Sequence, residues 1–321
     1  MRYVIYGAGA IGASVGAKLH MNGIEVALIA RGAHLKALQA DGLTLIHPDG
    51  TEHLKMPSYG HPSEIEWRPD DVCVLAVKSQ DTQAALEQLR LCAGDDVPIV
   101  CAQNGVENER MALRLFPRVY GQLVFMIALH LDPGVVDLAG WPKSGVFDLG
   151  RYPTGVDDLS QQIAADFDSS GLVARAEPRI MAWKYTKMLQ ILINPVHAVC
   201  GPRADHADIV KQIRDEAIAC YNAAGIDYVP MEEMATRQGL ANRSQGPRPG
   251  AGSTWQSLAR GAGSIEVDFL NGEIALLGRL HNVPTPANET IQVLADRMAR
   301  EHQQPGSITP DEVRAEIAKR S

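Results

Sequence analysis

The first thirty-one residues constrain the fold of this chain more than any other stretch. Residues 2–6 form a short apolar, β-branched and aromatic run, which predicts a buried strand. A helix-compatible run ends at Met21, and residues 24–29 predict a second strand. Between the first strand and the helix lies a G-x-G-x-x-G turn, Gly7-Ala8-Gly9-Ala10-Ile11-Gly12. This order predicts a βαβ unit that binds a dinucleotide through the six residues of the turn.

The three glycines of this turn have distinct predicted roles. Gly7 permits the tight turn, Gly9 allows the pyrophosphate to approach the backbone, and Gly12 lets the helix pack closely on the strand. The phosphates are expected to accept hydrogen bonds from the backbone N–H groups at the helix N-terminus.

The end of the second strand indicates which dinucleotide is bound. An NAD site places Asp or Glu there to hold the ribose 2′-hydroxyl, whereas an NADP site places Arg near the 2′-phosphate. The chain has Arg31 and no acidic residue at this edge. A guanidinium can bind a phosphate with two donors, and a carboxylate would repel it. We therefore predict NADP(H), with a solvated surface arginine as the alternative.

Two polar residues follow predicted buried strands. Residues 71–77 and 98–102 are nearly continuous apolar runs, typical of central parallel strands. Lys78 and Asn104 come after them, at the edge where ligands of open α/β sheets bind. Both are therefore predicted to line the nicotinamide side of the cofactor. The alternatives are a surface lysine and a turn-forming Asn-Gly pair.

The residue pattern predicts two domains of different class. A hairpin is expected within residues 43–55 and an antiparallel extension of the sheet over residues 120–151. Beyond Glu177-Pro178 only helical periodicities remain. We predict an α/β fold with an N-terminal Rossmann-type doubly wound sheet in residues 1–178 and an all-α domain in residues 179–321.

The first helix of the second domain, predicted over residues 180–199, carries the candidate catalytic groups. At about 100° per residue, five side chains share one face: Trp183, Lys184, Lys187, Ile191 and Asn194. A lysine on such a face is desolvated, which lowers its pKa toward a range useful for proton donation. The alternative is that both lysines reach water. Pro195 is expected to interrupt the helix.

Two later segments supply candidate substrate ligands. Ser253, with Gln three residues on, predicts a capping box after the loop 246–252, and Thr254 adds a hydroxyl near the same helix N-terminus. Residues 265–277 predict an amphipathic helix with Glu266 at the margin of its apolar seam. The alternatives are a purely structural cap and a solvated charge.

Charge and cysteine content narrow the functional class. The net charge of −8 and the pI near 5.7 do not favour binding to nucleic acid or to an anionic membrane. No apolar run approaches membrane-spanning length. The five cysteines lack metal-site or disulfide spacing, which predicts reduced thiols, no metal and a cytoplasmic location. The first predicted strand starts at residue 2, so we expect no signal peptide.

In these residues and their order, the chain resembles the ketopantoate reductase (2-dehydropantoate 2-reductase) family over nearly its whole length. The matching pieces are the glycine turn, Arg31, Val77-Lys78, Gln103-Asn104-Gly105, Ile193-Asn194-Pro195, Ser253-Thr254 and the run 266–272. The resemblance implies a Rossmann domain joined to a helical domain like that of 6-phosphogluconate dehydrogenase, with the site between them. It also implies reduction of the C2 ketone of ketopantoate to (R)-pantoate with NADPH, in pantothenate synthesis. The family's helix lysine is the general acid, and its helix glutamate and asparagines hold the substrate hydroxyl.

The chain departs from the family pattern in the catalytic helix. The family has Lys, then Asn four residues later, then Asn-Pro four residues after that. Counting back from Asn194, those positions hold Gln190 and Thr186, so Lys187 is displaced by one residue. The missing amide removes one expected hydrogen bond to the substrate. Thr254 stands where a serine is usual, which keeps the hydroxyl.

The sequence thus predicts an NADPH-dependent 2-oxoacid reductase, most simply of ketopantoate. Lys187, or else Lys184, is the predicted proton donor. The residues expected to bind substrate are Asn194, Glu266, Ser253 and Thr254. The predicted partners are a small-molecule 2-oxoacid and, as one candidate assembly, a second copy of the chain in a homodimer. The alternatives are reduction of another branched 2-oxoacid and a non-catalytic NADP(H) sensor.

Overall fold

The computed structural model describes residues 1–242, 252–261 and 263–320. Contacts divide the chain into two compact units: residues 1–184 with 229–246, and residues 185–228 with 247–321. This division differs from the predicted boundary at residue 178. The reason is hydrophobic packing, because Ile180, Trp183 and Met234 share a buried cluster with strand residues such as Val146.

The first unit contains a seven-stranded sheet with the strand order β13-β8-β7-β6-β1-β2-β5. Its strands are β1 (Arg2–Tyr6), β2 (Glu25–Ile29), β5 (Ser58–Tyr59), β6 (Asp71–Leu75), β7 (Ile99–Cys101), β8 (Val119–Gln122) and β13 (Leu149–Arg151). All neighbours pair in parallel except β13, which is antiparallel to β8. From β1 the chain continues to β2 on one side and later returns to β6 on the other. The predicted Rossmann-type α/β sheet is confirmed, and its switch point lies between β1 and β6.

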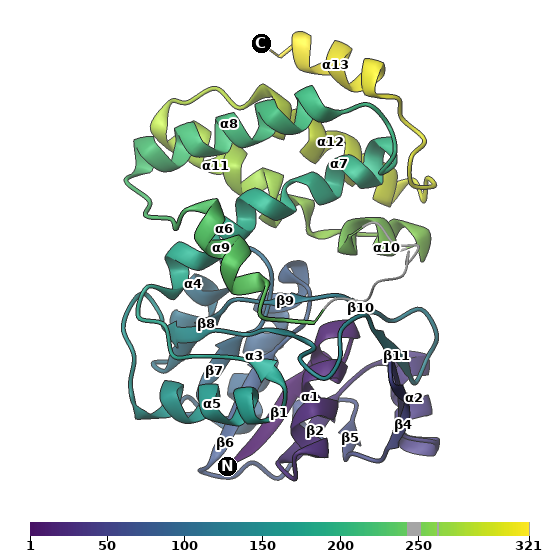
Figure 1. The fold of residues 1–321 in the computed structure, drawn as a ribbon, viewed down its shortest axis with the longest axis vertical. Coiled ribbons are helices and arrows are strands. Elements are labelled where there is room, and N and C mark those ends of the chain that lie inside the picture. The colour runs from purple at the N-terminus through teal and green to yellow at the C-terminus, as the bar shows by residue number, and fades with distance from the viewer. Residues whose placement is uncertain (243–251, 262, 321) are drawn as a thin grey trace. The chain divides into compact units, whose positions relative to one another are not determined.

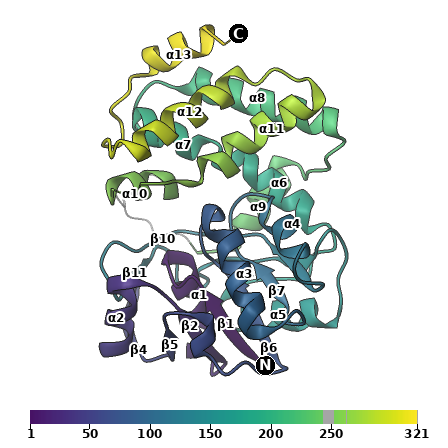
Figure 2. The same ribbon diagram turned by 180° about the vertical axis from the view of Figure 1, so that it is seen from behind.

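Helices cover both faces of this sheet (Figures 1 and 2). The helices of the unit are α1 (Ala10–Met21), α2 (Gly32–Ala40), α3 (Thr82–Ala93), α4 (Asn108–Leu113), α5 (Asp158–Ser169) and α9 (Met231–Gln238), with the 3₁₀ turns η1 (Pro62–Glu64) and η2 (Ser79–Asp81). Alternate side chains of β1 enter different cores, as the period of a strand requires. Tyr3 and Ile5 pack with residues of α1 and α5, whereas Val4 packs with residues of α3 and α4. Burial on both faces explains why these strands read as continuous apolar runs.

The predicted antiparallel extension over residues 120–151 is wrong for most of its strands. The strands outside the main sheet are β3 (Leu43–His47), β4 (Gly50–Leu54), β9 (Phe125–Met126), β10 (Ala128–Leu129), β11 (Val135–Leu138), β12 (Gly145–Val146) and β14 (Leu172–Val173). β3 and β4 form the predicted hairpin, but β10 and β11 join it in a four-stranded sheet. β9, β12 and β14 form a third sheet. Among the described residues of this range, β13 extends the main sheet antiparallel. β11 instead pairs with β3, far away in sequence.

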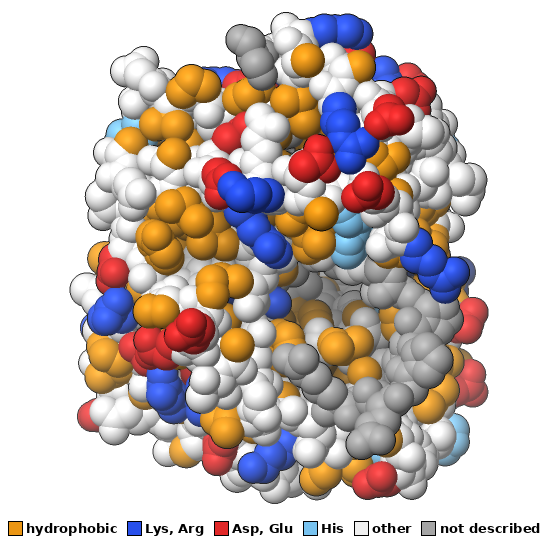
Figure 3. Space-filling view, turned by 45° about the horizontal axis from the view of Figure 1, so that its top comes forward, with side chains coloured by type: hydrophobic (Ala, Val, Ile, Leu, Met, Phe, Trp, Pro, Cys, Tyr) orange, Lys and Arg blue, Asp and Glu red, His pale blue; other side chains and the backbone are white. Residues whose placement is uncertain are grey.

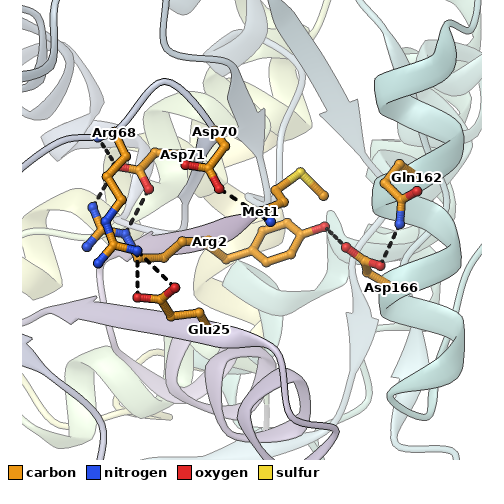
Figure 4. Close-up of polar contacts among 9 residues, drawn as sticks. Met1, Arg2, Glu25, Arg68, Asp70, Asp71, Gln162 and Asp166 are labelled. Atoms are coloured by element: carbon orange, nitrogen blue, oxygen red, sulfur yellow. Dashed lines mark hydrogen bonds and ion pairs between the residues drawn. The ribbon is translucent and has the colours of Figure 1, made fainter.

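Polar contacts tie down the amino ends of the central strands (Figure 4). The buried Arg2 donates two hydrogen bonds to the carboxylate of Asp71, at 2.7 and 2.6 Å, and so links β1 to β6. The hydroxyl of Tyr3 donates to Asp166 of α5 at 2.7 Å. These contacts lie at the end of the sheet opposite the glycine turn, so they stabilise the fold without approaching the predicted cofactor edge.

The second unit is helical in its described residues, as predicted. The helix α6 (Ile180–Ile191) contains the division between the units. The others are α7 (Ile193–Cys200), α8 (Ala207–Ala224), α10 (Ser253–Ala259), η3 (Glu266–Phe269), α11 (Asn271–His281), α12 (Pro286–Arg300) and α13 (Pro310–Ala318). The buried carboxylate of Glu216 on α8 accepts hydrogen bonds from the backbone N–H groups of Ala287 and Asn288, at 2.9 and 3.0 Å. A carboxylate at a helix N-terminus is favourable, so Glu216 fixes α12 against α8.

Pro195 breaks the predicted helix over residues 180–199, and the break lies before the proline itself. α6 ends at Ile191 and α7 begins at Ile193. A proline cannot donate to the carbonyl four residues earlier, and its ring clashes with that carbonyl. For Pro195 this carbonyl belongs to Ile191, where α6 ends. The proline is accepted in the first turn of α7, where no intrahelical donor is needed.

Charged side chains of both signs are interspersed on the molecular face drawn in Figure 3, with apolar side chains between them. Among the residues that the structure describes, no helix has the length and apolar character needed to span a bilayer. Within the same residues, His, Cys, Asp and Glu side chains form no group of three or more suited to hold a metal ion.

Candidate functional site

The glycine turn has the geometry of a phosphate-binding loop. Gly7 has a φ of +105°, and a Cβ there would lie 2.6 Å from the backbone nitrogen of Val77, so only glycine fits. A Cβ on Gly12 would collide with the backbone carbonyl of Gly7. A Cβ on Gly9, in contrast, would meet no atom within 4 Å. The space over Gly9 is therefore open to a ligand, as the pyrophosphate of a dinucleotide requires.

Backbone donors at the start of α1 complete this loop. The first intrahelical bond of α1 is donated by the N–H of Ala13 to the carbonyl of Gly9, at 2.9 Å. The N–H groups of Ala10, Ile11 and Gly12 are therefore those that a helix start leaves for an external partner. No side chain caps this N-terminus. The donor set and the space over Gly9 fit the phosphates of a dinucleotide.

A cavity of about 470 Å³ lies beside this turn, entirely within the first unit. Its walls come from the glycine turn, the end of β2 and the loop after β6. Among its lining residues are Gly7, Ala8, Gly9, Arg31, Lys78 and Asp81. The structure thus brings together most of the residues predicted to bind cofactor. Ala10, Ile11, Gly12 and Asn104 lie outside this lining. The carbonyl of Asn104 accepts a hydrogen bond from Asn108 at 3.0 Å.

Arg31 is paired with an acidic residue that the sequence did not indicate. Its Nη2 lies 3.3 Å from Oδ2 of Asp81, which lies just before α3. The Arg31 side chain is 77% exposed, so this pair is weak and easily exchanged for another anion. Arg31 can therefore turn its guanidinium to a phosphate group in the cavity.

His34 is a further residue of the cavity wall that the sequence analysis missed. Its Nε2 donates to the carbonyl of Ala8 at 2.7 Å, and its Nδ1 accepts from the N–H of Gly134 at 2.9 Å. Each contact fixes one ring nitrogen, so the imidazole is neutral with the proton on Nε2. Burial, together with the neighbouring ring of His130, lowers the pKa of His34 to about 4. No motif marks this histidine, because its partners lie in the glycine turn and in a distant loop.

The lowered pKa of His34 predicts a loss of stability in mild acid. Between pH 6.5 and about 4 the unfolded chain binds a proton at this residue and the folded chain does not. The free energy of unfolding should therefore fall as the pH drops through this range. We expect the melting temperature of His34→Gln to fall less between pH 7 and pH 5 than that of the wild type.

The matched control for this pH dependence is His53→Gln, because His53 is an exposed histidine of β4. The melting temperature of this variant should fall with decreasing pH as much as that of the wild type. Thermal unfolding by circular dichroism at several pH values measures all three proteins. An equal fall in melting temperature for the wild type and His34→Gln would show that His34 is not the source of the acid sensitivity.

Lys184 forms a buried ion pair with Glu109 in the first unit. Its Nζ lies 2.6 Å from Oε1 of Glu109, and the two side chains are 3% and 0% exposed. The same ammonium donates to the backbone carbonyls of Gln103 at 2.9 Å and Gln122 at 3.2 Å. The ammonium thus has a buried counter-charge and two backbone acceptors. This arrangement supports a structural role for Lys184.

The residues predicted to bind substrate lie in the second unit, and two of their elements are in contact. A Cβ on Gly252 would lie 2.6 Å from the side chain of Asn194, so a larger residue there would require that side chain to move. The structure thereby brings Asn194 of α7 to the start of α10, where Ser253 and Thr254 follow. Lys187 is half-buried and lies in α6. The predicted face shared by both lysines and Asn194 is broken, because α6 ends before Asn194.

Two local predictions in this unit are wrong. Ser253 is the first residue of α10 and forms no cap, because Gly252 occupies the N-cap position. Most of the loop predicted over residues 246–252 lies outside the described residues. Glu266 belongs to the 3₁₀ turn η3, since the backbone bends at Leu270 before α11 begins. Glu266 is half-buried there, so it is not a fully solvated charge.

Comparison with known proteins identifies the family. The family model described as "Ketopantoate reductase PanE/ApbA" matches residues 3–153, and its C-terminal counterpart matches residues 179–299. The chain belongs to the ketopantoate reductase family. The resemblance inferred from the sequence is thereby confirmed, and the protein is an oxidoreductase of this family.

Relatives of this ketopantoate reductase family member match nearly its full length. The 2-dehydropantoate 2-reductase of Pyrococcus horikoshii is 30% identical over 298 residues, covering 90% of this chain and 94% of the relative. The enzyme of the same name from Mesorhizobium japonicum is 29% identical over 333 residues, covering 94% and 98%.

Two solved structures share the fold. A PanE/ApbA family ketopantoate reductase from Ralstonia eutropha JMP134 is similar with a TM-score of 0.79 and 26% identity, over 94% of this chain and 99% of that one. D-mandelate dehydrogenase, solved with NADH and anilino(oxo)acetate, has a TM-score of 0.81 at 23% identity, over 94% and 99%. The second likeness extends to the fold alone.

Proposed function

We propose that the protein reduces ketopantoate (2-dehydropantoate) to (R)-pantoate with NADPH, in pantothenate biosynthesis and in the cytoplasm. The observation that carries this proposal is the match to 2-dehydropantoate 2-reductases across 90% or more of the chain. The cavity beside the glycine turn supports it, because it combines a phosphate loop with Arg31 at the end of β2.

The proposed mechanism gives each predicted site residue a role. A bound nicotinamide supplies the hydride for the C2 carbonyl carbon. Lys187 donates a proton to the carbonyl oxygen, so that the ketone becomes a hydroxyl. Asn194 and Glu266 orient the substrate hydroxyl, and Ser253 with Thr254 binds the carboxylate. Lys187 is preferred over Lys184 as the donor, because the ammonium of Lys184 is held in a buried ion pair with Glu109 and donates to two backbone carbonyls.

The direct test is the initial rate of NADPH oxidation, followed by absorbance, with ketopantoate as substrate. We expect ketopantoate to be the best of a panel that also contains other branched 2-oxoacids and phenylglyoxylate. Tight NADPH binding without turnover of any 2-oxoacid would contradict the proposal and favour a sensor.

A second candidate function is reduction of a different branched 2-oxoacid. It is favoured by Gln190, which stands where the family pattern has an asparagine. The fold likeness to D-mandelate dehydrogenase is the reason for including phenylglyoxylate in the panel. A kcat/KM for ketopantoate well below that of another oxoacid would establish this alternative.

Cofactor preference gives a sharper prediction at Arg31. Arg31→Ala should raise the KM for NADPH roughly tenfold to a hundredfold, since a hydrogen bond to a charged group contributes about 1.5–3 kcal/mol. The KM for NADH should stay within about twofold, because NADH lacks the 2′-phosphate that Arg31 would bind. Steady-state kinetics with both cofactors measure the two effects.

The matched variant is Asp81→Asn, which removes the carboxylate partner of Arg31 and keeps the size of the side chain. With its competitor gone, Arg31 should bind the 2′-phosphate at least as well, so the KM for NADPH should stay equal or fall. An equal rise of both KM values in Arg31→Ala would show that Arg31 does not distinguish the cofactors.

A further inference from the structure

A buried hydrogen-bond network joins the loop after β6 to the loop after β7. The first of these loops carries Lys78 and the second carries Asn104. The side-chain amide of Gln103 donates to the carbonyl of Val77 at 2.8 Å and to the hydroxyl of Thr82 at 2.7 Å. Gln103 is 5% exposed and Thr82 is fully buried, so these bonds are shielded from water.

The network continues from Thr82 to the second loop. The hydroxyl of Thr82 donates to Oδ1 of Asn108 at 2.8 Å. The amide of Asn108 then donates to the carbonyl of Asn104 at 3.0 Å and to the hydroxyl of Ser79 at 3.2 Å. Asn108 is fully buried. Thr82 therefore connects the two amides, accepting from one and donating to the other.

A second anchor holds the loop after β7 through its backbone. The backbone carbonyl of Gln103 accepts a hydrogen bond from the buried ammonium of Lys184, at 2.9 Å. The side chain and the backbone of Gln103 are thus both fixed, one residue before Asn104. The preceding loop is fixed at Val77 and Ser79, the two neighbours of Lys78.

Thr82 itself does not line the cavity, although Lys78 and Asp81 do. We propose that Thr82 is a positioning residue, whose hydroxyl holds the loops of Lys78 and Asn104 in the conformation that binds the nicotinamide cofactor. This inference rests on the proposed function. A preformed loop pair lowers the entropy lost when the cofactor binds, so loss of the hydroxyl should weaken binding from a distance.

The test compares Thr82→Val with Thr82→Ser. Valine is nearly isosteric with threonine and lacks the hydroxyl, whereas serine keeps the hydroxyl. Thr82→Val should raise the Kd of NADPH roughly tenfold, equivalent to about 1.4 kcal/mol, when binding is measured by NADPH fluorescence without substrate. In the same variant without cofactor, the backbone amides of residues 77–79 and 103–105 should exchange hydrogen faster. Thr82→Ser should resemble the wild type in both measurements.

Tyr3→Phe is the matched control, because it removes a hydrogen bond of the same sheet at its opposite end. It should lower the melting temperature and leave both the Kd and the exchange of the two loops unchanged. Unaltered loop exchange in Thr82→Val, or an equal rise of Kd in Tyr3→Phe, would overturn the positioning role while the proposed function stands. A wild-type protein that binds neither NADPH nor NADH would overturn both proposals.

Discussion

Lys187→Ala is expected to lower kcat for ketopantoate reduction by roughly 10²- to 10⁴-fold, the usual contribution of a positioned general acid. The alkoxide that forms at C2 would then take its proton from water. The Kd of NADPH should change little, because the residues proposed to bind the cofactor lie in the first unit. Stopped-flow or steady-state rates at saturating cofactor, with Kd measured by fluorescence, separate the two effects.

Two further substitutions distinguish proton donation from a general loss of charge. Lys187→Arg keeps the positive charge, but a guanidinium stays protonated at neutral pH and is a poor proton donor, so this variant should remain slow. Lys211→Ala removes an exposed lysine of α8, in the same unit, and should retain wild-type kcat. Full turnover by Lys187→Ala would exclude Lys187 from the mechanism.

The parts of this fold that the sequence predicted are those that short-range patterns determine. The run 2–31 predicted β1, the glycine turn, α1 and β2, because glycine positions and apolar periodicity act over a few residues. The same holds for the β3–β4 hairpin. Pro195 predicted a break in the helix expected over residues 180–199, although the steric cause lies at Ile191, four residues earlier.

The features that the sequence did not predict depend on contacts between distant segments. Helical spacing placed Lys184 on a face with Lys187, but spacing alone does not tell what packs against that face. The groups that pack against Lys184 are the carboxylate of Glu109 and the backbone carbonyl of Gln103. Neither group is marked by a helix-spacing pattern. The pairing of β11 with β3 was not predicted from the sequence for the same reason, because it joins distant segments.

The proposed cofactor site shows the same division between local and distant causes. Gly7 and Arg31 were predicted because the turn and the strand end have fixed chemical requirements. His34 and Thr82 act through hydrogen bonds to other loops, and no local motif marks such residues. Residues proposed to contact the cofactor are therefore easier to predict from the sequence than residues that contact other loops.

Lys184 provides the second large effect, and it is an effect on stability. Lys184→Met should lower the free energy of unfolding by about 3–5 kcal/mol, because it leaves the carboxylate of Glu109 buried without its counter-charge. The carbonyls of Gln103 and Gln122 also lose a donor. The expected fall in melting temperature is roughly 6–20 °C for a unit of this size. Urea and thermal unfolding measure it directly.

Removing the buried charge together with its partner separates this effect from loss of packing. The double variant Lys184→Met/Glu109→Gln should regain a large part of the lost stability, since no unpaired ion remains. Lys211→Met, which breaks the exposed pair with Asp215, should change stability by less than about 1 kcal/mol. A stable Lys184→Met that binds NADPH normally but has lost turnover would contradict the structural role. That outcome would make Lys184, and not Lys187, the proton donor.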